Sequence, residues 1–143
     1  MTFRLKIREW VDLFFHDVYD YFAALHDAVR LHFAIKLADA KQRAYNKRYF
    51  VMPDYLNKLT VINNNDIKWL KRAHLMRKQV SHLEIMRDCL YYTPLSRNDE
   101  SSRMTIEERM QRKAKWLSYM ERVRSRYYQN KLNKIHQRHA RKK

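Results

Sequence analysis

Residues 47–65 read KRYFVMPDYLNKLTVINNN, and they interrupt a chain whose periodicity is otherwise helical. Residues 49–52 form a β-prone run that is stopped by Pro53 and Asp54. Residues 58–62 form a second such run, which is stopped by three asparagines. Two short strands separated by a turn of this composition predict an antiparallel β-hairpin.

Two short helices are predicted after the hairpin. The first is capped by Asn63 or Asn64 and runs to about Leu75, because an asparagine side chain can accept a hydrogen bond from a free amide at a helix start. The second begins with a capping box at Ser81 and runs to about Asp88.

A third strand is predicted over residues 89–93, CLYYT, which Pro94 ends. Cys89 is the single cysteine, and we interpret it as a small buried hydrophobic residue, because no activating neighbour is recognisable. We expect Trp69 and Leu70 to lie on the helix that covers the hairpin, so that truncating either to alanine destabilises the fold.

The segment before the hairpin is predicted to be one long helix, from about Thr2 to Asn46. Apolar residues recur there at i, i+3, i+4 and i+7. Phe15, Tyr19 and Phe33 widen this apolar stripe, so the helix either packs on several neighbours or offers a surface to another protein chain or a second copy. Acidic residues occupy its polar face, which argues against an anionic membrane as a partner.

The same helix carries Asp12, His16 and Asp20, four residues apart on one face. This spacing also suits a metal or acid–base set, but one helix supplies too few ligands, so we interpret it as a solvated polar stripe with local ion pairs. The chain contains no glycine, which argues against phosphate-binding loops and dinucleotide folds. We predict no catalytic residue, metal site or cofactor, and no enzymatic activity.

After Pro94 the chain is polar and rich in turn-forming residues, and it is interpreted as an exposed linker. A second capping box at Thr105 opens another long helix, which continues to about His139. A truncation at Ser102 is expected to leave the preceding segment folded. The predicted fold is α+β and helix-dominated, with a small antiparallel hub of two to three strands and short helices between two long helices. Its segments are the first long helix (1–46), the hub (47–94), the linker (95–102) and the basic helix with its tail (103–143).

Charge is the strongest functional signal. The formal net charge is +16 and the sequence pI is about 10.1, values that favour polyanionic partners. Residues 103–143 hold fourteen basic and three acidic side chains, an excess of eleven, whereas residues 1–38 hold five of each. Lys and Arg neutralise phosphates, and interspersed tyrosines can stack on unpaired bases.

These features predict a non-enzymatic, sequence-tolerant nucleic-acid-binding protein that contacts phosphates through the basic C-terminal helix, with single-stranded DNA or RNA favoured. The alternative is a structural or adaptor protein that binds other protein chains, or another copy of itself, through the long helices. The candidate contact residues are Lys68, Lys71, Arg72, Arg77, Lys78, Arg112, Lys115, Tyr119, Arg122, Arg126, Tyr127, Lys134, Arg138 and Arg141.

Three parts of the hub carry a family resemblance: KRYFVMP at residues 47–53, NDIKWLKR at residues 65–72 and CLYYT at residues 89–93. Over residues 39–94 the chain resembles small basic proteins encoded by small icosahedral single-stranded-DNA phages of gut bacteria. Those proteins have no assigned activity, so the resemblance carries over no functional residue. It implies a phage setting in a bacterial cytoplasm, with single-stranded DNA as the polyanion or a virion or assembly role as the alternative.

Overall fold

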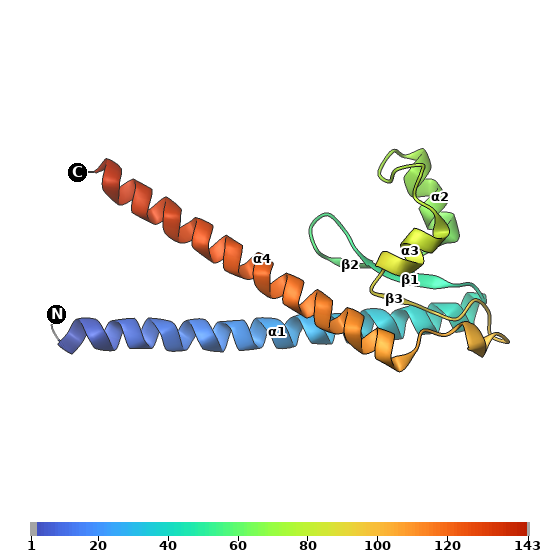
Figure 1. The fold of residues 1–143 in the computed structure, drawn as a ribbon, viewed down its shortest axis with the longest axis horizontal. Coiled ribbons are helices and arrows are strands. Elements are labelled where there is room, and N and C mark those ends of the chain that lie inside the picture. The colour runs from blue at the N-terminus through green and yellow to red at the C-terminus, as the bar shows by residue number, and fades with distance from the viewer. Residues whose placement is uncertain (1–2, 143) are drawn as a thin grey trace. The chain divides into compact units, whose positions relative to one another are not determined.

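The computed structural model describes residues 3–142, which fall into two compact units. The central unit is Val29–Ala114, and it contains the whole hub. The end unit is formed by Met1–Ala28 together with Lys115–Lys143. Two long helices, labelled in Figure 1, contribute to both units, and they are α1 (Phe3–Tyr45) and α4 (Ile106–Arg141). The chain is therefore α+β and helix-dominated, as its sequence predicts.

The hub contains the predicted hairpin and a third antiparallel strand. In the sheet order β2-β1-β3, Val51 pairs with Val61 on one side and with Tyr91 on the other. The third strand is shorter than predicted, because Cys89 still closes the preceding helix and only two residues complete the ladder. The strands are β1 (Tyr49–Pro53), β2 (Leu59–Asn63) and β3 (Tyr91–Tyr92).

Polar side chains shape the tight turns of a chain that lacks glycine. In the hairpin loop, Asp54 Oδ1 accepts hydrogen bonds from the backbone amides of Leu56 and Lys58 at 2.8 and 2.9 Å. The left-handed backbone positions are taken by Asn46, Asn57 and His74, with φ of 55°, 59° and 59°. Asparagine tolerates this conformation better than most residues, which explains its presence in both turns of the hairpin region.

The two short helices begin where their caps predict. Asn63 caps α2 (Asn64–Arg72): its side chain accepts from the Asp66 amide, while Asp66 accepts from the Asn63 amide, both at 3.0 Å. Ser81 caps α3 (His82–Asp88) by accepting from the amide of the third helical residue at 3.2 Å. Helix α2 ends at Arg72, before the predicted position, because His74 turns the backbone into the left-handed region.

The core of the hub lies on one face of the sheet. Phe50 is fully buried there, together with Ile67 of α2, Ile85 of α3 and Cys89. Because side chains alternate along a strand, the neighbouring Val51 faces the other side, where it is equally buried.

Helix α2 packs on Phe50 of the hairpin, but through Ile67; Trp69, one of the two residues expected to cover the hairpin, lies on the outside. The Trp69 side chain is 59% exposed, whereas Ile67, two positions earlier, is 5% exposed. Residues two apart on an α-helix point about 200° apart, so burying Ile67 turns Trp69 outward. Leu70 is half-buried.

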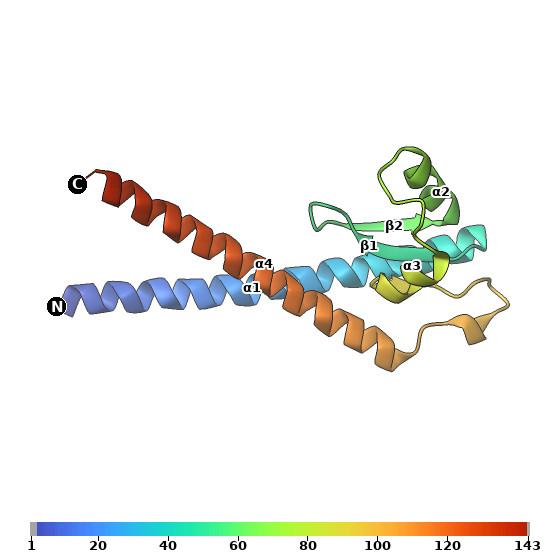
Figure 2. The same ribbon diagram turned by 45° about the horizontal axis from the view of Figure 1, so that its top comes forward.

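The last part of α1 covers the second face of the sheet. In Figure 2 it runs behind the strands while α3 lies in front of them. Leu31, Ile35 and Ala38 are buried on this helix, and the Tyr91 hydroxyl donates to Asp39 Oδ1 at 2.7 Å. Both faces of the sheet are therefore covered, which explains why its strands are apolar on both sides.

The central unit continues past the predicted hub (47–94) and linker (95–102) into the first turns of α4. Met104 is 4% exposed, and Arg112 Nη1 donates to the backbone carbonyls of Met86 and Cys89, each at 2.7 Å. The first turns of α4 thus belong to the central unit, and a truncation at Ser102 would remove them.

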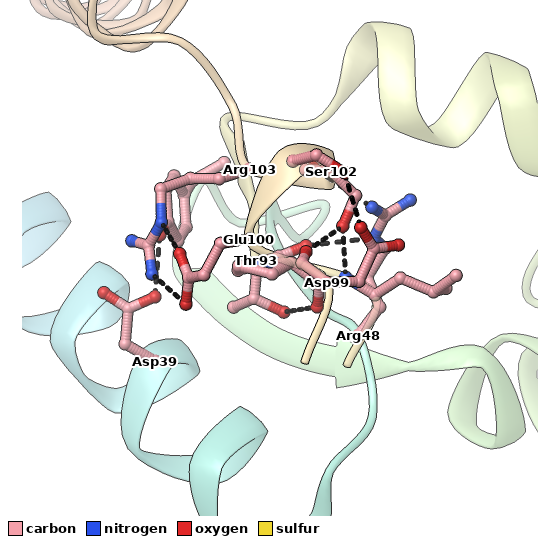
Figure 3. A network of polar contacts seen from close by, with 11 residues as sticks. Asp39, Arg48, Thr93, Asp99, Glu100, Ser102 and Arg103 are labelled. Atoms are coloured by element: carbon pink, nitrogen blue, oxygen red, sulfur yellow. Dashed lines mark hydrogen bonds and ion pairs between the residues drawn. The ribbon is translucent and has the colours of Figure 1, made fainter. Parts of the chain in front are cut away.

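The predicted linker is fastened to the sheet by a buried arginine (Figure 3). Arg48, 7% exposed, donates from Nε to the Thr93 carbonyl at 2.9 Å and from Nη2 to the Ser102 carbonyl at 3.2 Å. Burial lowers the pKa of the Arg48 guanidinium. The linker also contains a short 3₁₀ turn, Glu100–Ser102, where Glu100 pairs with Arg103 at 2.9 Å.

In the end unit, the described contacts between α1 and α4 include an ion pair and an aromatic stack. Asp27 forms an ion pair with Arg124, and the His16 ring stacks on Tyr128 with centroids 4.5 Å apart. His16 Nδ1 also lies 3.6 Å from Asp20, a local contact of the kind expected for the polar stripe. The Asp12 side chain lies outside the described residues. Among residues that are described, no three His, Cys, Asp or Glu side chains gather as metal ligands.

Candidate nucleic-acid interface

The predicted contact residues divide between the two units. The central unit holds Lys68, Lys71, Arg72, Arg77, Lys78 and Arg112. The end unit holds Lys115, Tyr119, Arg122, Arg126, Tyr127, Lys134, Arg138 and Arg141. Each group is therefore a candidate surface in its own right.

Four of the α4 residues form one exposed row, which we call the basic stripe: Lys115, Tyr119, Arg122 and Arg126. Their spacing of i, i+4, i+7 and i+11 places them within an arc of about 60° on an α-helix. The side chains at positions 116, 120 and 124, which are buried or half-buried, lie on a different side of the helix. The stripe thus faces away from the side of α4 that is covered in this unit.

Along α4 itself, few acidic residues accompany the stripe. From position 115 to the end, the sequence carries ten basic residues and one acid, Glu121. The ion pair with Asp27 in this part of α4 uses Arg124, which is not in the stripe. The arginines of the stripe are exposed, so their charge is presented to the solvent rather than neutralised internally.

The three tyrosines of α4 differ in exposure and in ring contacts, a difference that the sequence alone does not show. Tyr119 is 41% exposed, and its ring stacks on Trp116 with centroids 5.6 Å apart. Tyr128 is also 41% exposed and stacks on His16. Tyr127 is 72% exposed, the most accessible of these three rings, but it lies about 100° around the helix from Arg126 and so is not part of the stripe.

Beyond the stripe, the last turns of α4 extend the positive charge without continuing the row. Lys134 and Arg138 are exposed, but they lie on a different side of the helix from Arg122 and Arg126. Arg141 is exposed at the end of the helix. These residues add to the electrostatic potential more than to a defined contact row.

In the central unit, two of the predicted contact residues are used inside the protein. Lys71 Nζ donates to the Val80 carbonyl at 2.7 Å and so closes the loop between α2 and α3. Arg112 holds the carbonyls at the end of α3, and its guanidinium lies 5.5 Å from the centre of the Tyr92 ring. The partners of Arg112 lie 23 and 26 residues earlier, so no local pattern identifies its role.

The remaining basic residues of this group are exposed, and two of them flank Trp69, a ring that the sequence-based interpretation assigns to the helix covering the hairpin. Lys68 and Arg72 lie one turn apart on α2, with Trp69 beside them, and Arg77 and Lys78 follow in the next loop. The outward position of Trp69 is encoded in the helical phase, because an apolar pair at i and i+3, residues 67 and 70, defines the inner side.

The titratable groups of the core are held neutral rather than activated. Burial raises the pKa of the Cys89 thiol to about 11, and the nearby Arg112 only partly offsets this effect. Burial and the hydrogen bond to Asp39 raise the pKa of Tyr91. These two groups therefore act as packed, hydrogen-bonded parts of the hub.

Comparison with protein-family models, curated proteins and solved structures finds no match to this chain. Within residues 3–142, no helix is both long enough and apolar enough to cross a membrane.

Proposed function

We propose that this chain is a non-enzymatic, sequence-tolerant nucleic-acid-binding protein that contacts phosphates through the basic stripe of α4. The observation that carries the proposal is the exposed row of Lys115, Arg122 and Arg126 in a segment with an excess of nine positive charges, ten basic against one acidic. Arginine matches phosphate geometry through its planar fork of donors, and a row along one helix can follow a backbone.

Binding of this kind does not distinguish one base from another, and its affinity depends strongly on salt concentration. Phosphates dominate the contacts, so released counterions set the affinity, and base identity matters little. Exposed aromatic rings of α4, Tyr119 in the row and Tyr127 on an adjoining side of the helix, favour single strands, because only unpaired bases offer their faces for stacking.

The proposal includes a setting. The resemblance of the hub to proteins of single-stranded-DNA phages favours single-stranded DNA in the cytoplasm of a bacterial host. RNA shares the same phosphate chemistry, and a comparison of DNA and RNA oligonucleotides distinguishes the two.

Fluorescence-anisotropy titrations of the purified protein test this proposal. The probes are labelled single strands of several sequences and hairpin duplexes, each measured at several salt concentrations. Five to seven engaged cations predict a slope of log affinity against log salt of about −4 to −6, with similar values for different sequences. A protein that binds none of these probes at low salt would refute the proposal.

A second candidate function, protein binding, is favoured by the apolar surface of α1. In the end unit, Phe14, Phe15, Tyr19 and Phe22 are 53–66% exposed. In the central unit, Phe33 is 64% exposed. Single exposed apolar residues are ordinary, but a concentration of large rings on one helix is typical of protein interaction surfaces.

The oligomeric state tests this second function. If α1 binds another copy, light scattering after gel filtration gives a concentration-dependent mass above the 17.8 kDa of one chain. Phe15→Gln with Phe22→Gln should then restore the monomer while nucleic-acid affinity stays unchanged. A monomer at all concentrations would show that α1 does not bind another copy, and protein binding through α1 would then require a different protein.

A further inference from the structure

The outer side of α2 carries an exposed indole between cations. The Trp69 side chain is 59% exposed, and its neighbours Lys68 and Arg72 are also exposed. Side chains three and four residues apart on a helix have Cβ atoms about 5–6 Å apart, so Arg72 lies within reach of the ring and of Lys68.

The surroundings of this indole are positive. Residues 64–80 contain five basic side chains and one acid, Asp66. The Asp66 carboxylate already caps α2 by accepting from the Asn63 amide at 3.0 Å. Lys71 is engaged with the Val80 carbonyl, which leaves Lys68 and Arg72 as exposed cations beside the ring on α2, with Arg77 and Lys78 exposed in the segment that follows.

We infer that Trp69, Lys68 and Arg72 form a second binding site, the α2 platform, which stacks an unpaired base on the indole and pairs the adjacent phosphates with the two cations. The occupant is a single-stranded nucleic acid, because it alone combines flat apolar rings with closely spaced negative charges. An acidic protein would satisfy the cations, but it offers no ring to the indole.

The inference rests on the proposed function but lies in the other unit of the chain, so the two can be separated by experiment. The α2 platform contains no residue of α4. It also predicts an optical signal that depends on Trp69, which substitution of Trp69 separates from any change at Trp116 beside the stripe.

Three variants of the full-length protein test the inference against oligo(dT) and a hairpin duplex. Trp69→Ala should weaken oligo(dT) binding by roughly five- to 150-fold, the range expected for one stacked base, and leave both duplex affinity and the salt slope unchanged. Trp69→Phe keeps a ring and should retain most of the affinity. Leu83→Ala, at an apolar residue on α3 that is 75% exposed, is the matched control and should bind normally.

Tryptophan emission gives the second readout. Oligo(dT) should quench the emission of the natural protein. Trp69→Phe should lose the part of this quenching that arises at Trp69 although it still binds, and the difference between the two proteins measures that part. Polyglutamate, a polyanion without bases, should cause no such quenching.

The outcomes separate this inference from the proposed function. Normal oligo(dT) binding by Trp69→Ala, with weakened binding by Arg122→Gln and Arg126→Gln, would overturn the α2 platform and leave the α4 proposal standing. Equal quenching by polyglutamate would overturn it in favour of an acidic protein partner. A protein that binds no nucleic acid at all would overturn both.

Discussion

Two arginines in this protein act as structural donors rather than as surface charges. Arg48 and Arg112 each reach backbone carbonyls from distant parts of the chain, and each lies above the ring of Tyr92, at 5.2 and 5.5 Å. A guanidinium offers five donors in one plane, so it can satisfy several carbonyls where helices and strands end. The sequence shows these residues only as part of a large positive charge.

Removing the donors of Arg112 should destabilise the hub. In Arg112→Met the apolar stem remains, but the carbonyls of Met86 and Cys89 lose their donor, and each unsatisfied buried group costs about 1–3 kcal/mol. We expect thermal or denaturant unfolding to show a decrease of about 2–4 kcal/mol in the free energy of unfolding. The matched control, Arg122→Met on the exposed stripe, should change it by less than about 0.5 kcal/mol. Equal stabilities of the two variants would contradict the structural role of Arg112.

The Cys89 thiol should be unreactive in the folded protein. Its pKa is raised to about 11 by burial, so little thiolate exists at neutral pH, and thiolate is the nucleophile. Alkylation by iodoacetamide should be slow under native conditions and should accelerate on addition of denaturant. Rapid native alkylation would show that the end of α3 opens readily.

The raised pKa of Cys89 also makes the free energy of unfolding fall at alkaline pH. Folding favours the neutral thiol, so this contribution is complete below the ordinary thiol pKa and disappears as the pH rises through about 11. The raised pKa of Tyr91 acts in the same direction. Unfolding free energies measured from neutral to alkaline pH should therefore fall, and Cys89→Ala should reduce the fall. A stability that is constant or rises over this range would contradict the burial of these groups.

At the scale of helices and strands, local chemistry determines much of the hub. The hairpin, the Asn63 cap and the Ser81 cap follow from residues that lie close together in the sequence, so they could be predicted from it. The prediction for α2 names Trp69 and Leu70 as the covering residues and misses Ile67, which is the buried one. The exposure of Trp69 follows from the helical phase of Ile67 and Leu70, whereas the contacts of Arg112 depend on tertiary packing and no short pattern reveals them. The positive charge of α4 is evident from composition, but its arrangement as a row requires the helix.

Because Ile67 faces the core and Trp69 faces outward on α2, substitutions at these two positions should differ in their effect on stability. Ile67→Ala removes a buried side chain from the core beside Phe50 and should cost about 2–5 kcal/mol in the free energy of unfolding. Trp69→Ala removes a larger side chain from the surface and should change it by less than about 0.5 kcal/mol. Denaturant unfolding of the two variants measures the difference, and a larger decrease in Trp69→Ala would reverse the assignment of inside and outside on this helix.

At the scale of the whole molecule, positive charge is distributed unevenly along the chain. The net charge of +16 lies mainly in residues 103–143, and in each unit the α1 segment exposes large apolar rings. Residues 103–143 are far more positive than solubility requires, whereas the acids of the chain lie mostly before them. This uneven charge favours α4 as the site for a polyanion, and a protein partner on α1 would use different residues.

The central claim is that the basic stripe of α4 neutralises phosphates. The measurement is the salt dependence of oligo(dT) affinity for full-length Arg122→Gln with Arg126→Gln, compared with a control of equal charge, Arg30→Gln with Lys36→Gln on α1. If two fewer phosphates of a single strand are neutralised, the log–log slope should flatten by about 1.4, while the control keeps the natural slope. If both double variants change the slope equally, or neither changes it, the stripe does not bind the phosphates and the account is contradicted.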